Sequence, residues 1–159
     1  MDITDEYAVD EFIAAWGAAT RPTEYGDPAH CDECAEANRI LMALDRDELD
    51  RTELIESSKG WFYAWMGFEG WLYFLPGIVK TAMMDPSKDL RILLDQLRPE
   101  YLSSLTLERA KALHKFLHHC RACAYASDDS ERASLQLAID LTKTDLPAAG
   151  CAADPARLT

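Results

Sequence analysis

The sequence predicts an all-α protein, a single-domain bundle of about six to seven helices with an aromatic-rich core. Apolar residues recur at intervals of three and four in several segments, as they do on the buried face of an amphipathic helix. Strand-like period-2 alternation and the Asn-Gly or Asp-Gly turns of β-hairpins are absent from the sequence. We assign residues 1–145 to one helical domain and residues 146–159 to a disordered tail.

The first two helices are expected in the N-terminal third of the chain. Apolar spacing predicts a helix near residues 4–19. The dipeptide Asp27-Pro28 is typical of a helix start, because aspartate is a favoured N-cap and proline fits the first helical position. A second helix is therefore expected to begin at Pro28, to end near Asp45 and to carry Cys34 on its apolar face.

Aromatic residues dominate the middle of the chain. A short helix is expected after Thr52, and eight aromatic side chains lie within 14 positions further on. Residues 61–79 carry a single charge, Glu69, and are long enough to span a membrane. A central carboxylate costs about 2.5–3.5 kcal/mol on insertion, so we interpret the segment as buried core. Pro76 is expected to kink or divide it.

Three further helices are expected towards the C-terminus. Pro86 begins a short helix that ends near Leu97. Thr106 is predicted to cap the longest helix, which runs to about residue 126. A last amphipathic helix carries Leu135, Ala138 and Leu141.

The chain has a formal net charge of −12, from 28 acidic and 16 basic residues. This charge disfavours binding to the phosphate backbone of nucleic acids and favours a protein partner with a basic surface. The first twelve residues are acidic, whereas a secretory signal begins with basic residues. We therefore predict a cytoplasmic protein without a membrane span. Its cysteines are expected to be free thiols or metal ligands rather than disulfides.

Two Cys-x-x-Cys pairs, Cys31/Cys34 and Cys120/Cys123, carry the main candidate chemistry. Four thiolates can hold one zinc ion in a closed structural site, which makes these residues candidate metal ligands. The members of each pair lie close enough on a helix to reach one ion. A shared zinc requires the two pairs to face each other. Otherwise the cysteines are small apolar core residues, or a redox dithiol in which Cys31 has a low pKa near a helix start.

Histidines lie beside both cysteine pairs, His30 next to the first pair and His118 and His119 next to the second. His118 and Cys120 are about 160° apart around a helix, so one metal cannot take both the histidine pair and the cysteine pair. His114 and His118 have a common metal-binding spacing, but no glutamate of a metalloprotease motif lies between them. We interpret this pair as structural, at a helix interface.

Two short motifs, His30-Cys31-Asp32-Glu33-Cys34 and Tyr73-Phe74-Leu75-Pro76, resemble those of a bacterial protein family. That family, a domain of unknown function, has a His-Cys-x-Glu-Cys opening and a Tyr-Tyr-Leu-Pro motif, from which Phe74 departs. The resemblance covers residues 28–120 and implies a bacterial cytosolic helical domain, but no activity. The second cysteine pair is not a feature of the family, which weakens the four-cysteine zinc site.

No complete set of catalytic residues is present in the sequence. Glu69 lies among aromatic residues and is a candidate general acid or base with a raised pKa. No partner for it can be named, and the more common expectation for such a residue is that it points to water at a helix edge. A phosphate-binding loop, a nucleophile elbow and a kinase signature are all absent. We therefore predict a non-enzymatic, acidic helical protein that binds a protein partner, in the manner of an inhibitor or immunity factor. The alternative is a zinc-stabilised or thiol-active module that uses the paired cysteines.

Overall fold

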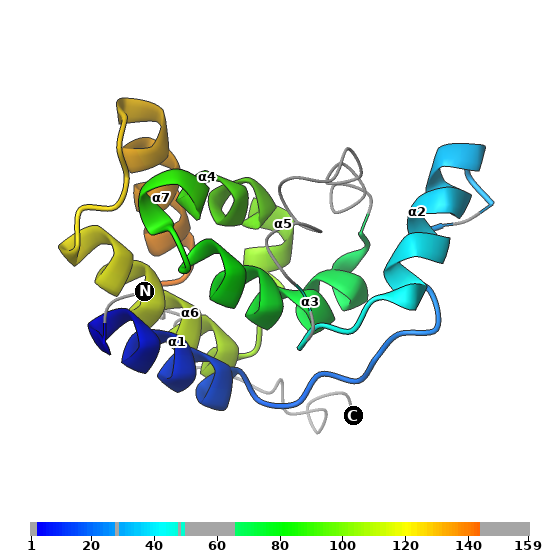
Figure 1. Cartoon of the computed structure of the whole chain (residues 1–159), viewed down its shortest axis with the longest axis horizontal. Coiled ribbons are helices and arrows are strands. Elements are labelled where there is room, and N and C mark those ends of the chain that lie inside the picture. Colours follow the sequence, from blue (N-terminus) through cyan, green and yellow to red (C-terminus); the bar gives the residue numbers. More distant parts are fainter. Residues whose placement is uncertain (1–2, 28, 48, 50–65, 144–159) are drawn as a thin grey trace, which may run out of the picture.

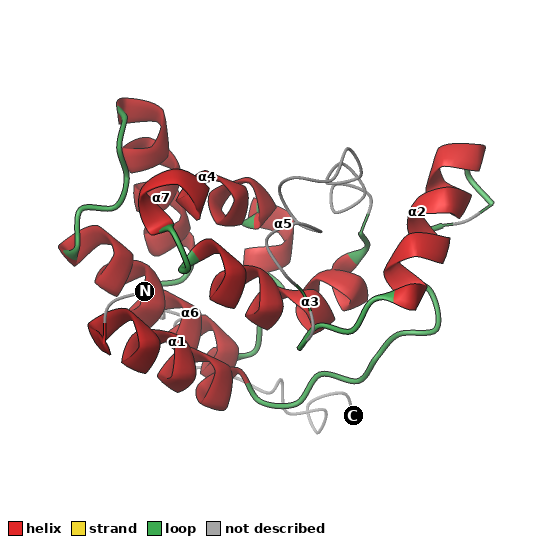
Figure 2. Cartoon of the chain, in the orientation of Figure 1, coloured by secondary structure: helices red, strands yellow, loops and turns green. Residues whose placement is uncertain are grey.

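The computed structural model describes residues 3–27, 29–47, 49 and 66–143. This part of the chain forms seven α-helices and no strand, which confirms the all-α prediction (Figures 1 and 2). The helices are α1 (Ile3–Trp16), α2 (Asp32–Ala43), α3 (Phe68–Ala82), α4 (Pro86–Gln96), α5 (Pro99–Leu102), α6 (Leu107–Ala122) and α7 (Asp129–Leu141). None of them is long and apolar enough to cross a membrane. The helix expected after Thr52 and the tail expected from residue 146 lie outside the described residues.

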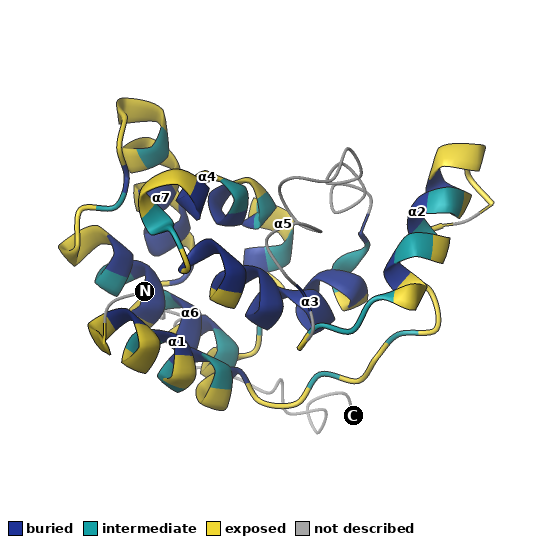
Figure 3. Ribbon diagram, in the orientation of Figure 1, coloured by how far each residue is buried: buried dark blue, intermediate teal, exposed yellow. Residues whose placement is uncertain are grey.

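Helix α3 is the most buried element of the bundle (Figure 3). Of its 15 residues, 12 are buried, whereas Glu69 and Lys80 are exposed. Helices α1 and α4 pack against α3, α6 packs along α1, and α7 contacts α4, α5 and α6. The apolar run in α3 is therefore core, as predicted. Because Glu69 points to water, it is not a carboxylate buried among aromatic rings.

The aromatic core predicted from the sequence lies between α1, α3 and α6. The ring centroid of Trp16 is 5.2 Å from that of Phe12 and 5.9 Å from that of Trp71. Phe116 contacts Phe12, with 5.3 Å between the ring centroids. The indole N–H of Trp71 donates to the carbonyl of Gln96 at 2.8 Å, so the buried ring leaves no polar atom unpaired.

Pro76 lies inside α3, which continues through it from Phe68 to Ala82. Of the two outcomes expected at Pro76, a kink or a division, the division therefore does not occur. Proline has no N–H to donate to the carbonyl four residues earlier, which belongs to Leu72. That carbonyl instead accepts a hydrogen bond of 3.1 Å from the indole N–H of Trp16. Helix α1 thus satisfies the acceptor that proline leaves free.

Two glycines of α3 leave room for the chain segments before and after α2 to pack against the α3 backbone. A Cβ atom on Gly77 would clash with the carbonyl oxygen of Arg46. A Cβ atom on Gly70 would lie 3.2 Å from the carbonyl oxygen of Tyr25 and closer still to its ring. Because Tyr25 precedes α2 and Arg46 follows it, these close approaches attach both flanks of α2 to the core.

Most observed helix boundaries are close to the predicted ones. Helix α1 ends at Trp16 rather than near residue 19, because Gly17 has a left-handed φ of 75°. Helix α4 ends one residue before the predicted Leu97. Thr106 caps α6 as predicted, and its side chain accepts a hydrogen bond from the backbone N–H of Arg109.

Helix α6 ends at Ala122, four residues earlier than predicted. Ala124 has a left-handed φ of 55°. Its N–H donates to the carbonyl of Arg121 at 3.1 Å, and the N–H of Tyr125 donates to that of Cys120 at 3.3 Å. These two bonds form a Schellman motif, in which alanine occupies the position that usually holds glycine. The motif turns Tyr125 back towards α1.

Candidate functional site

Cys31 is the N-cap residue of α2, so the helix does not begin at Pro28 as predicted. The Asp27 carboxylate accepts a hydrogen bond from the N–H of Ala29 at 2.9 Å. The Asp27 carbonyl accepts another from the N–H of His30 at 3.2 Å. Asp27 therefore closes a turn instead of capping a helix. This difference places the first thiol in front of the helix rather than along its side.

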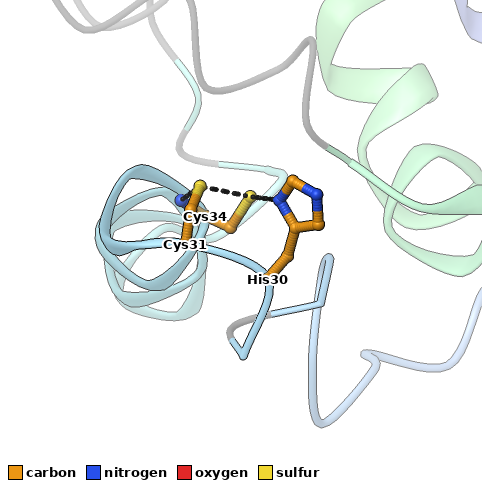
Figure 4. A group of neighbouring side chains, drawn as sticks. All are labelled: His30, Cys31 and Cys34. Carbon is orange, nitrogen blue, oxygen red and sulfur yellow. Dashed lines mark hydrogen bonds between the residues drawn. The ribbon is translucent and has the colours of Figure 1, made fainter.

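His30, Cys31 and Cys34 form a cluster at this end of α2 (Figure 4). The two Sγ atoms are 3.1 Å apart, and Cys31 Sγ accepts a hydrogen bond from the N–H of Cys34 at 3.3 Å. The Nδ1 atom of His30 lies 3.4 Å from Cys34 Sγ. Cys31 is half-buried whereas Cys34 is buried, so the first thiol is the more accessible to a reactant.

The environments of the two thiols shift their pKa values in opposite directions. The pKa of Cys31 is lowered, first by its hydrogen bond with the Cys34 side chain, then by the Cys34 N–H and by His30. The pKa of Cys34 is raised to about 11, by its hydrogen bond with Cys31 and by loss of solvation. The pKa of His30 is raised by the Cys31 side chain. One thiol is therefore favoured as a thiolate, while the other retains its proton.

Polar contacts hold α2 in place behind the cluster. The Arg21 guanidinium donates to the carbonyls of Met42 and Leu44, at 2.6 Å and 2.8 Å. The side-chain oxygen of Asn38 accepts a hydrogen bond from the N–H of Tyr25 at 2.7 Å. A cation at the C-terminal end of α2 and a thiolate at its N-terminal end both match the direction of the helix dipole.

The second cysteine pair lies far from the first. Helix α2 is at one edge of the view in Figure 1, whereas the C-terminal end of α6, coloured yellow, is at the opposite edge. Burial raises the pKa of the Cys120 thiol to about 12, and Cys123 is exposed just beyond α6. Helix α6 packs on α1 and α7. For this reason the structure does not bring the four predicted zinc ligands, Cys31, Cys34, Cys120 and Cys123, together.

His114 and His118 lie side by side on α6, with 4.5 Å between their ring centroids. The Nδ1 atom of His114 is 3.1 Å from the hydroxyl of Thr142, at the end of α7. The guanidinium of Arg121 is 2.9 Å from Nδ1 of His118, and burial followed by this cation lowers the pKa of His118. These contacts agree with the interpretation of the pair as structural.

A polar cluster that the sequence did not predict joins the start of α1 to the end of α6. Asp5 is only 3% exposed, and its Oδ1 atom lies 2.9 Å from His119 Nε2. The same oxygen accepts a hydrogen bond of 2.6 Å from the hydroxyl of Tyr125. Cys123 Sγ lies 3.7 Å from His119 Nε2. Asp5 stands four residues before Val9 on the apolar face of α1, which is a sequence signal for a buried carboxylate.

The cluster of His30, Cys31 and Cys34 has the atoms for two kinds of chemistry. Its donor atoms lie within 4.8 Å of one another, so it could hold a metal ion. A low-pKa thiol beside a buried thiol can also exchange with disulfides. No family model matches the chain, and comparisons with curated proteins and with solved structures found no significant match. The function must therefore be inferred from the residues themselves.

Proposed function

We propose that the protein is a thiol-active module in which Cys31 and Cys34 act as a redox dithiol. The position of Cys31 carries this proposal, because its Sγ caps α2 and lies 3.1 Å from Cys34 Sγ. Helix N-termini stabilise thiolates through their free N–H groups and the helix dipole. The two sulfur atoms need to approach by only about 1 Å to reach the length of a disulfide bond.

The proposed reaction begins when the Cys31 thiolate attacks one sulfur of a disulfide R–S–S–R′. A mixed disulfide between Cys31 and R forms, and R′–S⁻ leaves and takes up a proton. Cys34 then passes its proton to His30 Nδ1, which lies 3.4 Å away, and attacks Cys31 Sγ. The group R leaves as a second thiol, and a Cys31–Cys34 disulfide remains. The protein dithiol is oxidised by two electrons, and the substrate disulfide is reduced to two thiols.

Zinc binding is the competing use of the same cluster. His30, Cys31 and Cys34 offer three donor atoms, whereas a closed structural zinc site needs four. Within the described ranges, no fourth histidine, cysteine or carboxylate joins this group. A zinc ion here would need a water molecule or a further ligand to complete its coordination. We favour thiol exchange because Cys31 Sγ caps α2 and lies 3.1 Å from Cys34 Sγ, a geometry suited to a disulfide.

Reaction with glutathione disulfide tests the proposed dithiol. The reduced chain is mixed with glutathione disulfide, and the products are identified by mass spectrometry of alkylated peptides. We expect an intramolecular Cys31–Cys34 disulfide with release of two glutathione thiols. Cys34→Ala should stop the reaction at a mixed disulfide on Cys31, and Cys31→Ala should abolish the rapid reaction with glutathione disulfide. The buried Cys120 thiol should remain unmodified in every sample.

Cys151→Ser is the matched control, because it removes a thiol that lies outside the described residues. It should react at the rate of the parent chain. Equal rates of mixed-disulfide formation at Cys31 and Cys123 would contradict the special role of the N-cap position. If the purified chain instead contains equimolar zinc, and the reaction starts only after a chelator removes it, the cluster is assigned to metal binding.

The surface of α1 favours a second candidate function, the binding of a basic protein. Ile3 and Tyr7 are 83% and 70% exposed, beside the exposed carboxylates of Glu6 and Asp10. Apolar side chains among carboxylates suit a partner that presents both apolar and basic groups, as an inhibitor or immunity factor would require. In pull-downs with basic proteins, Tyr7→Ala should weaken a complex at least about tenfold. Met84→Ala, at an exposed apolar residue between α3 and α4, should leave it unchanged.

A further inference from the structure

The cluster of Asp5, His119 and Cys123 lies where α1 begins and α6 ends. We propose that these residues form a zinc site, with a carboxylate, an imidazole and a thiolate as its protein ligands. Their donor atoms lie within 4.8 Å of one another. The inference concerns a different part of the molecule from the Cys31–Cys34 dithiol and does not depend on it.

The spacing of the donor atoms is close to that of a tetrahedral zinc site. With bonds of about 2.1 Å to oxygen and nitrogen and about 2.3 Å to sulfur, tetrahedral angles separate N and O by about 3.4 Å and N and S by about 3.6 Å. In the structure, His119 Nε2 lies 2.9 Å from Asp5 Oδ1 and 3.7 Å from Cys123 Sγ. Zinc therefore requires the N–O distance to lengthen by about 0.5 Å, while the N–S distance is already within about 0.1 Å of the ideal value, as zinc replaces the Asp5–His119 hydrogen bond.

The types of donor favour zinc over other common divalent cations. Thiolate and imidazole are typical zinc ligands, whereas magnesium and calcium prefer sites made of oxygen atoms. Three protein ligands leave one position of a tetrahedral ion for water or a small ligand. His119 also lines a groove of about 310 Å³ between α1 and α6, so the site borders open space.

The structure around the cluster already holds the ligands in place. The hydroxyl of Tyr125 donates to Asp5 Oδ1 at 2.6 Å, which is the kind of outer contact that orients a carboxylate ligand. The Schellman motif at the end of α6 brings Tyr125 to this position. The Asp5 side chain is 4% exposed and that of His119 is 20% exposed, while Cys123 is open to solvent. A metal ion can therefore enter from the Cys123 side.

Titration with cobalt(II) tests the site, because a thiolate ligand gives cobalt a charge-transfer absorption that oxygen and nitrogen ligands do not. The full chain is used with Cys31→Ser, Cys34→Ser and Cys151→Ser, so that the only remaining cysteines are the buried Cys120 and the exposed Cys123. We expect equimolar cobalt binding with this absorption and displacement of cobalt by zinc. Zinc should also raise the unfolding temperature of this chain through mass action.

Cys123→Ala in this background should abolish the absorption and weaken zinc binding at least about tenfold. Because Cys123 is exposed, this change leaves the core intact. His119→Ala should weaken zinc binding similarly. His118→Ala is the matched control, since His118 is adjacent in sequence but outside the cluster. Unchanged cobalt absorption in Cys123→Ala would overturn the proposal, as would a folded chain that shows no thiolate–cobalt absorption with cobalt in excess.

Discussion

At the scale of single residues, the Cys31 thiol differs most from an ordinary cysteine. Its pKa is lowered by the Cys34 side chain, the Cys34 N–H and His30. A lowered pKa extends the thiolate form to lower pH than in an ordinary cysteine, so the alkylation rate declines only when the pH falls through that lowered pKa. We therefore expect iodoacetamide to modify Cys31 before Cys34, with a pH midpoint below that of an unperturbed cysteine.

Peptide mass spectrometry over a series of pH values measures this alkylation rate for each cysteine. Cys34→Ala removes the S–H donor beside Cys31 and should move the midpoint for Cys31 upwards. A midpoint that stays in place would show that the neighbouring thiol is not the main cause of the low pKa.

Ala124 offers a second test at the residue scale, this time of stability. Its left-handed φ of 55° is unfavourable for a residue with a Cβ atom, and its side chain is exposed. Ala124→Gly should therefore raise the free energy of unfolding by about 1 kcal/mol, measured by urea denaturation. Ala122→Gly, two residues earlier within α6, should lower the same quantity by up to about 1 kcal/mol. A loss of stability in both variants would contradict the geometry of this turn.

The cysteines and histidines of the two candidate sites stand out in the sequence, but Asp5 and the surroundings of these residues do not. The Cys31/Cys34 pair and the adjacent His30 are visible as a motif. The N-cap position of Cys31 was missed because the Asp27-Pro28 signal for a helix start is stronger than any signal at a cysteine. The contact between Asp5 and His119 spans 114 residues, and no local pattern encodes such a distance.

At the scale of helices, the close approach of the chain to α3 at Gly77 can be tested. A Cβ atom on Gly77 would clash with the backbone carbonyl of Arg46, which cannot swing aside like a side chain. Gly77→Ala gains about 1 kcal/mol of helix propensity. Displacement of the Arg46 segment costs about 1–3 kcal/mol. We expect a net loss of up to about 2 kcal/mol in unfolding free energy, measured by urea denaturation.

Gly67→Ala is the control for this prediction. A Cβ atom on Gly67 would lie 3.6 Å from the carbonyl of Tyr25, an ordinary contact, and Gly67 precedes α3 as its N-cap. Gly67→Ala should lower the free energy of unfolding by less than about 1 kcal/mol. If Gly77→Ala stabilised the chain, the segment after α2 would not lie against α3 as the structure places it.

The helices themselves could largely be predicted, because each has an apolar face with the helical period. Pro76 shows where that reasoning fails. The expected break depends on an unsatisfied carbonyl at Leu72, and the indole of Trp16 supplies the missing hydrogen bond from another helix. A donor 56 positions away in sequence cannot be inferred from the local pattern around the proline.

At the scale of the whole molecule, the two proposed sites lie at opposite edges of the bundle. The dithiol is at the start of α2, and the proposed zinc site joins α1 to the end of α6 (Figure 1). Between them lie α3 and the aromatic core. Because coupling between distant sites needs an intervening element with two stable arrangements, we expect chemistry at one site to leave the other unaffected.

Hydrogen–deuterium exchange tests how far a change in the dithiol spreads through the molecule. Helix α2 buries only Cys34, Ala37 and Leu41, whereas α3 buries 12 of its 15 residues. Amides of α2 should therefore exchange by local opening, and those of α3 only by global unfolding. Formation of a Cys31–Cys34 disulfide should change exchange at the start of α2 and leave α3 and α6 unchanged. Faster exchange throughout α3 in the oxidised chain would instead indicate that the dithiol is coupled to the core.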